Sequence, residues 1–564
     1  MRDLVPALGT LRISPAEAHL AVRLSLRRGR PHDMPIDAAD TVVGHVLKWA
    51  DRTPEALAIT GASGDITYGD LARRVAAVCV HLTQSGLRQG GAAVVAGPRS
   101  ADSVITFLAL ESLGIVYVPL DANWPSDRMT DVIRRSGADH LISYHRDASA
   151  QELARATARA ADVTGVPLVK LPDAGDLIRT EKPSGLRTRC EDPTEPRYAF
   201  FTSGTTGTPK GALMEHQGML NHLWAKVVDL QLEQRDAVAL TAPLTFDIAI
   251  WQMTAPLLVG GRISVFDDQD LAFPRSLARR LREQEVTVVE LVPTVLEWLV
   301  KAAGVKGAES LRLVRRIVST GEELTPQLAE QLLAKLPQAQ VVNAYGFTET
   351  SDDVTHHVVG VADLAAARLP VGSPVIDSVL YVLVALDGQE HGWRAARHGE
   401  SGELFVGGLP PGIGYLGDAP ATEAAFFHDV FDPHSPTGRL YRSGDGVIVE
   451  NGCVRYLGRL DRQVKVAGVR MELGEIEAAL RRHAAVADCA VVAVADRTRG
   501  TGKELVGHLV LREDPPPVEE LHAYLLATLP SAMVPRHWRT HTALPVTGNG
   551  KTDHRSLARL SEAR

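Results

Sequence analysis

One short segment of the chain combines glycines, hydroxyl side chains and a single cation. The segment FFTSGTTGTPKG, residues 200–211, holds three glycines, four threonines, one serine and one lysine. Backbone amides exposed by glycine, together with hydroxyls and an ammonium group, are donors that bind phosphate oxygens. The composition therefore predicts a loop that holds a polyphosphate.

The spacing of this segment differs from the P-loop pattern GxxxxGK[ST]. Counting from Gly204, the second glycine of that pattern would fall on Pro209, and Lys210 is followed by Gly211. The same composition also suits a flexible surface loop. The function of the segment therefore has to be decided from the rest of the chain.

The elements around the loop alternate between short apolar runs and helical stretches. The runs AAVVAG (92–97), VTVVELV (286–292) and RRIVSTG (315–321) are typical of buried strands, whereas TPQLAEQLLAKL (325–336) is typical of a helix. This alternation predicts α/β architecture. Glycine-rich short strands between His398 and Leu460 predict an antiparallel or barrel-like piece, and the last hundred or so residues predict a small α+β domain. We expect three parts, namely a lead-in of residues 1–40, a large domain of residues 41–460 and a small domain of residues 461–564.

The composition is that of an ordinary soluble globular protein. The 564 residues carry a net charge of −8, which argues against a nucleic-acid-binding surface. The four cysteines are too scattered for a CxxC metal site or a disulfide framework, and they indicate reduced thiols in a cytoplasmic protein. No apolar run is long enough to span a bilayer, and the arginine-containing N-terminus lacks the apolar core of a secretory signal. We therefore expect no membrane partner.

Further motifs accompany the loop in a fixed order. They are ITYGDL (66–71), GIVYVPLDANWP (114–125), NAYGFTET (343–350), GELFVGG (402–408), YRSGD (441–445), GRLDRQVKVAGVRMELGEIE (458–477) and NGKTD (549–553). Together with YAFFTSGTTGTPKG they resemble adenylate-forming enzymes, the superfamily of acyl-CoA synthetases, luciferases and nonribosomal peptide synthetase adenylation domains. The segments VKVAGVRMELGEIE and YVPLD follow the amino-acid adenylation domains within it.

This resemblance implies both a fold and a reaction. The fold would be a large domain of two α/β subdomains plus a β-barrel-like piece, followed by a small mobile α+β domain. In the reaction, a carboxylate would attack the α-phosphate of ATP and expel pyrophosphate, and a thiol would then capture the acyl adenylate. Because charge builds on phosphate oxygens, Mg²⁺ and cationic side chains would carry the catalysis.

The resemblance also assigns roles to individual residues. The phosphate loop would act through Thr202, Ser203, Gly204, Thr205, Thr206 and Lys210. The remaining nucleotide contacts would come from Asn343, Tyr345, Thr348, Asp445, Tyr456 and Arg459. Glu349 would bind Mg²⁺, and Lys551 would bridge the substrate carboxylate and the α-phosphate. Asp461 would be the hinge about which the small domain rotates, withdrawing the lysine and admitting the thiol.

The substrate pocket is predicted from the segment LTFDIAIWQM (244–253). Its Asp247 matches the residue that binds the α-ammonium group in amino-acid adenylation domains, although an aspartate there also suits the N-cap of a helix. Alignment by motif places the other pocket positions at Ile248, Trp251, Glu290, Val318, Thr320, Ala344, Asp352 and Asp353. An α-amino acid is therefore the expected substrate.

Glu290 indicates the chemistry of the substrate side chain. It lies within the apolar run VTVVELVP, where an unpaired carboxylate is costly and where no Lys or Arg is present. Its cation is either a distant residue or the substrate, and we favour the substrate. Asp352 and Asp353 add negative charge, while the bulk of Trp251 and Glu290 shortens the pocket. This set resembles the family pattern for L-2,4-diaminobutyrate, and ornithine, lysine and β-lysine remain alternatives.

The partners follow from what surrounds the motifs. Thirteen residues follow Lys551, too few for a carrier domain, and no condensation motif precedes residue 41. The resemblance therefore predicts a stand-alone enzyme of nonribosomal peptide or antibiotic biosynthesis, with a separate phosphopantetheine carrier protein. An MbtH-like activator is a further candidate partner. The rival hypotheses are an acyl- or aryl-CoA ligase, an amide ligase that passes the adenylate directly to an amine, and a catalytically idle scaffold.

Overall fold

The computed structural model describes residues 7–31, 36–62, 64–145, 151–178, 185–203, 208–307, 311–386, 392–496, 502–512, 516–546 and 552–562. Four residues of the predicted site lie outside these ranges, namely Gly204, Thr205, Thr206 and Lys551. Within the described ranges, no helix has both the length and the apolarity that crossing a membrane requires.

The first α/β unit is built on a seven-stranded sheet in the order β21-β10-β9-β6-β5-β7-β8. Its strands are β5 (Ala92–Ala96), β6 (Val116–Leu120), β7 (His140–Ser143), β8 (Leu168–Lys170), β9 (Pro196–Thr202), β10 (Lys210–Glu215) and β21 (Gly414–Tyr415). Its helices are α3 (Tyr68–Gln84), α4 (Ala101–Leu113), α5 (Ser126–Ser136) and α6 (Gln151–Thr164). Successive residues of β5 alternate between two apolar cores, because helices cover both faces of the sheet. At its edge, β9 and β10 form an antiparallel pair on either side of the glycine-rich loop.

The second α/β unit holds a nine-stranded sheet in the order β17-β16-β15-β14-β13-β11-β12-β3-β4. Its strands are β3 (Leu57–Thr60), β4 (Ile66–Thr67), β11 (Ala237–Leu240), β12 (Arg262–Val265), β13 (Val288–Leu291), β14 (Arg316–Ser319), β15 (Gln340–Phe347), β16 (Asp352–Val358) and β17 (Ser373–Pro374). Its helices are α2 (Val42–Arg52), α7 (His216–Asp229), α8 (Ile248–Leu258), α9 (Asp268–Ala272), α10 (Pro274–Glu283), α11 (Pro293–Gly307) and α12 (Pro326–Lys335). The run from β3 through β15 is parallel, so the carboxyl ends of these strands meet at one edge.

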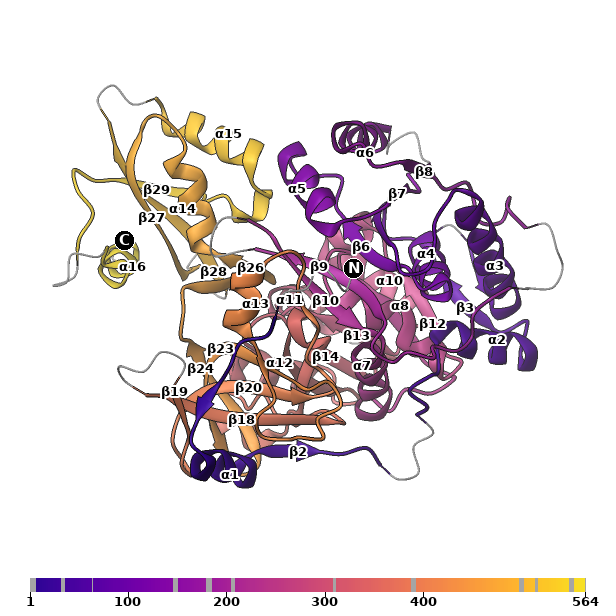
Figure 1. Ribbon diagram of the computed structural model, residues 1–564, viewed down its shortest axis with the longest axis horizontal. Helices are drawn as coiled ribbons and strands as arrows, with labels where there is room; N and C mark the ends of the chain where they lie inside the picture. Colours follow the sequence, from indigo (N-terminus) through magenta and orange to yellow (C-terminus); the bar gives the residue numbers. More distant parts are fainter. Residues whose placement is uncertain are drawn as a thin grey trace.

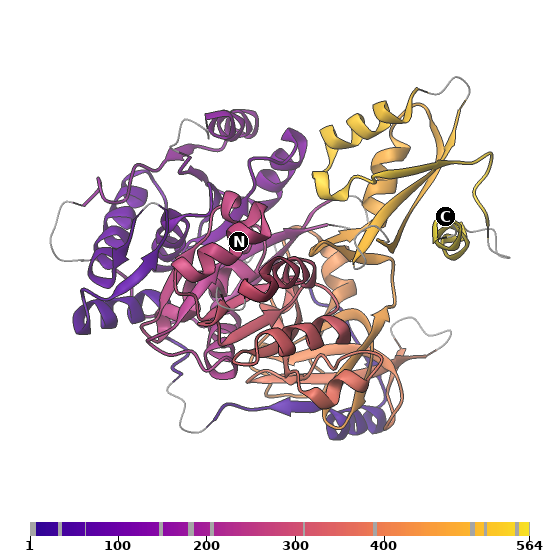
Figure 2. The same cartoon turned by 180° about the vertical axis from the view of Figure 1, so that it is seen from behind.

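The third unit is a largely antiparallel eight-stranded sheet. It contains β1 (Arg12–Ile13), β2 (Leu26–Arg28), β18 (Ser378–Ala385), β19 (Gly392–Ala395), β20 (Gly402–Gly408), β22 (Phe426–His428), β23 (Arg439–Glu450) and β24 (Cys453–Arg459), with helices α1 (Pro15–Leu24) and α13 (Ala419–Ala425). The lead-in strands β1 and β2 pair with β19 and β18, as the indigo segments beside the orange strands show in Figures 1 and 2. The sequence pattern did not predict this pairing, because two- and three-residue strands are too short to show a period.

The small C-terminal domain lies at one end of the molecule in both views (Figures 1 and 2). It contains the hairpin β25 (Gln463–Val466) and β26 (Val469–Glu472), the strands β27 (Val486–Ala495), β28 (Lys503–Leu511) and β29 (His537–Thr540), and the helices α14 (Leu473–Arg481), α15 (Val518–Thr528) and α16 (His554–Glu562). Among the described residues, 3-10 helices occur at η4 (Thr348–Thr350), η5 (Val361–Ala365) and η6 (Ser531–Met533). An apolar core of its own holds the domain together, and the hairpin β25–β26 projects toward the large domain.

Candidate functional site

A cavity of about 420 Å³ lies where the large domain meets the hairpin β25–β26. Its walls include the carboxyl ends of β14 and β15, the place where parallel α/β sheets usually bind ligands. Of the residues predicted from the sequence, those lining it are Asp247, Ile248, Thr320, Asn343, Ala344, Tyr345, Thr348, Asp352, Asp445, Tyr456 and Arg459. The predicted nucleotide contacts and part of the predicted substrate pocket therefore share one space.

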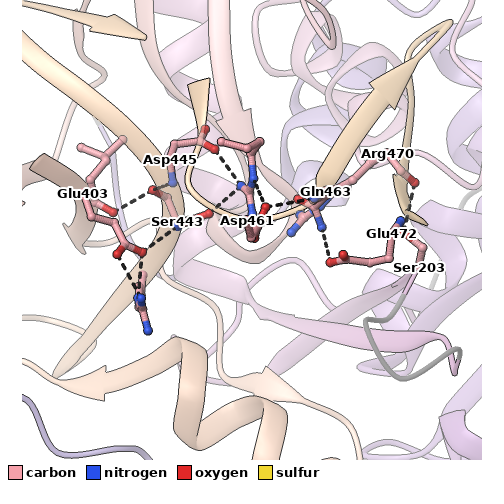
Figure 3. Close-up of polar contacts among 12 residues, drawn as sticks. Ser203, Glu403, Ser443, Asp445, Asp461, Gln463, Arg470 and Glu472 are labelled. Atoms are coloured by element: carbon pink, nitrogen blue, oxygen red, sulfur yellow. Dashed lines mark hydrogen bonds and ion pairs between the residues drawn. The ribbon is translucent and has the colours of Figure 1, made fainter. Parts of the chain in front are cut away.

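Asp445 is held in the cavity wall by two donors. The Tyr345 hydroxyl donates to its Oδ2 at 2.7 Å, and Arg459 Nη1 donates to its Oδ1 at 2.7 Å. Figure 3 shows Asp445 beside Ser443, whose hydroxyl accepts from the Asp445 amide. Burial raises the pKa of Asp445, and the neighbouring Arg459 opposes this rise. The carboxylate is thus fixed in a position from which it can accept hydrogen bonds from a bound sugar.

The strand β23 needs its glycine beside Asp445, where its register with β20 shifts. Gly444 adopts a φ of 74°, and a Cβ atom there would lie 2.6 Å from Arg459 Nη2. The same arginine also donates from Nε to Asp461 Oδ1 at 2.8 Å. Asp461, the predicted hinge, lies between the end of β24 and the start of β25, and its Oδ1 also accepts from the amide of Gln463 (Figure 3). Arg459 therefore joins the nucleotide-side carboxylate to the segment that leads into the small domain.

The described ends of the phosphate loop are brought together by the sheet. Thr202 at the end of β9 is the register partner of Lys210 at the start of β10. Lys210 Nζ lies 5.6 Å from the ring centroid of Tyr415. Neither Thr202 nor Lys210 is part of the cavity lining. The hairpin geometry nevertheless places both ends of the loop beside the aromatic residue that contacts Glu349.

Glu349 is a buried carboxylate whose two oxygens are both engaged. Its Oε1 accepts from the Tyr415 hydroxyl at 2.7 Å, and its Oε2 accepts from Arg470 Nη1 at 2.7 Å. Burial raises the pKa of Glu349, but the charge and hydrogen bond of Arg470 outweigh it and the pKa is lowered. An ionised carboxylate of this kind suits Mg²⁺, which is usually held by one or two carboxylates plus substrate phosphates.

A metal ion at Glu349 would compete with Arg470 for the same carboxylate. Among the described residues, no group of three or more His, Cys, Asp or Glu side chains is placed to hold a metal ion, so phosphate oxygens would have to complete the coordination. Arg470 belongs to the small domain and already neutralises Glu349. The carboxylate of Glu349 therefore suits Mg²⁺ in an arrangement where the hairpin β25–β26 is withdrawn and Arg470 no longer binds it.

The hairpin β25–β26 is docked on the large domain by backbone and side-chain hydrogen bonds. Ser203 Oγ donates to the Arg470 carbonyl at 3.2 Å and accepts from the Glu472 amide at 3.1 Å, as Figure 3 shows. Lys465 of this hairpin lines the cavity, and burial lowers its pKa while Asp445 and Asp247 oppose the decrease. Arg470 and Lys465 received no predicted role from the sequence, although both lie within the motif of residues 458–477.

Asp247 combines the two roles considered from the sequence. It lines the cavity, and its Oδ1 accepts from the Ile248 amide at 3.0 Å at the start of α8. Burial raises the pKa of Asp247, and a hydrogen bond from Thr348 opposes the rise. The carboxylate is therefore both a helix cap and an acidic group facing the cavity.

The structure corrects the prediction that the substrate supplies the cation for Glu290. Lys226 of α7 lies 3.2 Å from Glu290 Oε1 and also binds Asp353. Trp251 Nε1 donates to the other oxygen of Glu290. The cation that pairs with Glu290 is thus a residue distant in sequence, which was the other possibility. Four predicted pocket residues lie outside the cavity lining, namely Trp251, Glu290, Val318 and Asp353.

Asp352 is the second acid of the predicted substrate pocket that lines the cavity, after Asp247. It adopts a φ of 98°, which is unusual for a residue other than glycine, and follows Ser351 at a φ of 62°. Its Oδ2 has no hydrogen-bond partner among the described residues. The nearest basic atom is His222 Nε2 at 3.1 Å, but burial and Lys226 lower the pKa of His222 well below its usual value. Burial and the charges of Asp353 and Asp247 raise the pKa of Asp352.

Two protein families match the chain in sequence. Residues 46–416 match the family described as AMP-binding enzyme, and residues 475–551 match the AMP-binding enzyme C-terminal domain. The chain is 34% identical over 532 residues to phosphinothricin tripeptide synthetase PhsB of Streptomyces viridochromogenes, covering 92% of this chain and 42% of that protein. It is 32% identical to tyrocidine synthase 3 of Brevibacillus parabrevis, covering 92% of this chain and 8% of that protein. The chain thus spans less than half the length of these relatives.

A solved structure has a similar fold over most of the chain. The structure of holo-PA1221, a nonribosomal peptide synthetase protein containing adenylation and PCP domains and bound to a vinylsulfonamide inhibitor, superimposes with a TM-score of 0.77. The sequence identity is 26%, and the match covers 93% of this chain and 84% of PA1221.

Proposed function

Because the chain belongs to the AMP-binding enzyme family and has the adenylate-forming fold, we propose that it activates an α-amino acid as its adenylate for transfer to a carrier-protein thiol. The single observation that carries the amino-acid assignment is the position of Asp247. Its carboxylate faces the same cavity as Tyr345, Asp445 and Arg459, which the family resemblance assigns to the nucleotide. The transfer would serve nonribosomal peptide or antibiotic assembly, as the names of the relatives suggest.

Each residue assigned to the site would have a separate role in adenylation. Tyr345 and Asn343 would bind the adenine, Asp445 would accept hydrogen bonds from the ribose hydroxyls, and Asp247 would orient the amino acid by its α-ammonium group. The substrate carboxylate would attack the α-phosphate, forming the acyl–phosphate bond as the bond to pyrophosphate breaks. When bound, Mg²⁺ supplies positive charge to the phosphate oxygens, and Glu349 would hold it. Lys551, which lies outside the described residues, would bridge the two reacting anions.

The substrate class within this proposal is a short diamino acid, with L-2,4-diaminobutyrate as the best candidate. Glu290 and Asp353 no longer support it directly, because Lys226 already pairs with both. Asp352 does support it, because this acid lines the cavity and its Oδ2, which lies 3.1 Å from His222 Nε2, accepts no hydrogen bond among the described residues. A side-chain ammonium near Asp247 would supply that partner. Ornithine, lysine and β-lysine are the alternatives, and comparing substrates of different chain length decides among them.

Amino-acid-dependent ATP–pyrophosphate exchange tests the proposal. The panel contains 2,4-diaminobutyrate, 2,3-diaminopropionate, ornithine, lysine, β-lysine, neutral amino acids and aryl acids. We expect exchange with diamino acids, with the short ones preferred. Exchange with aryl acids alone would contradict amino-acid activation, and exchange with neutral amino acids alone would contradict the role of Asp352. Loading of a phosphopantetheinylated carrier, compared with direct transfer to free amines, separates the carrier-dependent enzyme from an amide ligase.

Replacing Asp352 by asparagine should reduce discrimination between 2,4-diaminobutyrate and 2-aminobutyrate. A hydrogen bond to a charged group contributes about 1.5–3 kcal/mol, so the ratio of the two kcat/KM values should fall about 10- to 100-fold. Glu290→Gln is the matched control, because Glu290 faces Lys226 rather than the cavity. We expect it to change the ratio by less than about threefold, which is under 1 kcal/mol. A larger effect of Glu290→Gln than of Asp352→Asn would show that Glu290 reads the substrate after all.

Arg470→Ala should separate the two half-reactions. The docked hairpin lines the cavity through Lys465 and Arg470, and neither Val546 nor Thr552, the described neighbours of the Lys551 segment, lines it. We infer that the docked arrangement serves thiol transfer rather than adenylation. Loss of the charged hydrogen bond to Glu349 should slow single-turnover transfer to the carrier about tenfold or more, while exchange is retained. Arg462→Ala is the control, since Arg462 pairs with Glu477 inside the small domain. Equal losses in both half-reactions of Arg470→Ala would contradict this assignment.

A further inference from the structure

Lys226 is a fully buried lysine in the wall behind the substrate side of the cavity. Its Nζ lies 3.2 Å from Glu290 Oε1, contacts Asp353 Oδ2, and lies 4.7 Å from the ring centroid of Trp251. Its side chain is 0% exposed. None of these four residues lines the cavity, and two of them, Trp251 and Asp353, lie close in the chain to residues that do. Trp251 follows Ile248 on α8, and Asp353 follows Asp352 on β16.

The lysine is the second member of a row of six alternating charges that begins at Glu290. Beyond Asp353, His356 Nε2 lies 3.3 Å from Asp353 Oδ2, and His356 Nδ1 lies 2.7 Å from Asp229 Oδ2. Arg28 of the N-terminal strand β2 ends the row, with its Nη2 2.7 Å from Asp229 Oδ1. With His356 protonated, the three cations of the row balance its three anions. Glu290 and Asp353 therefore contribute little net charge to the cavity.

The charges of the row stabilise one another. Burial lowers the pKa of Lys226, but Asp353 and Glu290 outweigh it and the pKa is raised, so the side chain stays an ammonium. For His356, burial lowers the pKa, but hydrogen bonds to Asp229 and Asp353 outweigh it and the pKa is raised. Removing one partner of a buried ion pair strongly destabilises the fold, so the paired carboxylates keep the Lys226 ammonium in place.

We propose that Lys226 is a specificity-determining residue whose own ammonium occupies the place where the terminal ammonium of a longer diamino acid would otherwise bind. The inference rests on the proposed amino-acid activation and names how the chain length of the substrate is set. The Lys226 side chain fills the space beside Trp251 and satisfies the two carboxylates that an ornithine or lysine would need. The side-chain ammonium of the substrate would then pair with Asp352. Asp352 lies in the cavity wall next to Asp247, and this position suits a short substrate side chain.

Lys226→Ala is the test, measured as the ratio of kcat/KM for lysine to that for 2,4-diaminobutyrate in ATP–pyrophosphate exchange. The substitution removes the internal ammonium and opens space beside Glu290 and Asp353. We expect the ratio to rise about 10-fold or more, because a terminal ammonium gains two buried carboxylate partners. Lys226→Met is the volume-matched control, which removes the charge but keeps the space filled. The proposal predicts no such rise in this variant.

A second variant keeps the test decisive if Lys226→Ala does not fold. Removing the cation leaves two buried carboxylates unpaired, which is strongly destabilising. Lys226→Ala combined with Asp353→Asn leaves Glu290 as a single acid in the opened space, and it should show a smaller rise for lysine in the same direction. Thermal unfolding of each variant establishes that folded protein is being compared. An unchanged ratio in the folded double variant would overturn the proposal, and so would an equal rise in Lys226→Met.

The readout also separates this inference from the proposed function. If the unaltered enzyme activates no diamino acid, the proposed substrate class fails. The affinity of each variant for lysyl-sulfamoyladenosine, a non-reactive adenylate analogue, then measures whether opening the Lys226 position admits a long amine. If the unaltered enzyme activates diaminobutyrate but Lys226→Ala gains no affinity for the lysyl analogue, the inference alone fails.

Discussion

Replacing Asp247 by asparagine is expected to lower kcat/KM for amino-acid-dependent ATP–pyrophosphate exchange about 100-fold or more. Removing one partner of a buried, hydrogen-bonded charge pair costs about 2–5 kcal/mol, and each 1.36 kcal/mol is a factor of ten. Because Asp247 would bind the α-ammonium group, the loss should be similar for every amino acid in the panel, unlike the selective effect of Asp352→Asn. ATP affinity, measured by calorimetry, should change little, since the nucleotide contacts come from other residues of the cavity.

Two further variants separate the binding role of Asp247 from its role as a helix cap. Asp247→Ser keeps a side-chain oxygen that can cap α8 but removes the negative charge. It should lose as much exchange activity as Asp247→Asn. Asp267→Asn changes a cap elsewhere, at α9, and should leave exchange unaffected. Recovery of activity in Asp247→Ser would show that the residue serves only the helix.

The nucleotide side of the site was predictable because its residues lie in short continuous motifs. Tyr345 and Asp445 belong to two such motifs, and each residue lies on one strand at the cavity, β15 or β23. Within a motif the local backbone fixes where the side chain points, as the glycine at position 444 shows. A motif match therefore transfers positions reliably. The roles of these residues toward ATP stay predictions.

The substrate side was less predictable because its charges are paired across the fold. The apolar run around Glu290 correctly indicates a buried strand, but no local pattern shows that α7 brings Lys226 to it. The two residues are 64 positions apart. For the same reason the sequence did not show that Arg28, in the lead-in, reaches Asp229. Burial follows from composition and periodicity, whereas the identity of an ionic partner follows only from tertiary structure.

The contact between Arg470 and Glu349 shows a second limit of motif analysis. Both residues were quoted in motifs, and Glu349 was assigned to Mg²⁺ from the resemblance alone. The structure adds that a small-domain arginine binds the same carboxylate. One carboxylate can thus be neutralised in turn by a metal and by the docked hairpin. The sequence motifs do not show this second partner, because the contact exists only where the small domain meets the large one.

Lys551→Ala is expected to lower the rate of adenylate formation about 10²–10³-fold, the size of effect seen when one donor to a developing anion is removed. The physical reason is that the lysine would offset repulsion between the substrate carboxylate and the α-phosphate. Single-turnover formation of aminoacyl adenylate measures the loss, and calorimetry should show ATP binding retained. Transfer from pre-formed adenylate to the carrier thiol should be nearly unchanged, the opposite of Arg470→Ala.

Lys465 provides the discriminating comparison for Lys551. Among the described residues it is a lysine of the docked hairpin that lines the cavity, close enough for Asp445 and Asp247 to influence its pKa. If the docked arrangement serves thiol transfer, Lys465→Ala should affect that half-reaction and spare adenylation. Loss of adenylation in Lys465→Ala with normal adenylation in Lys551→Ala would reverse the two assignments. The docked hairpin would then be the adenylating arrangement, and Arg470 would have to share Glu349 with the metal in a single state.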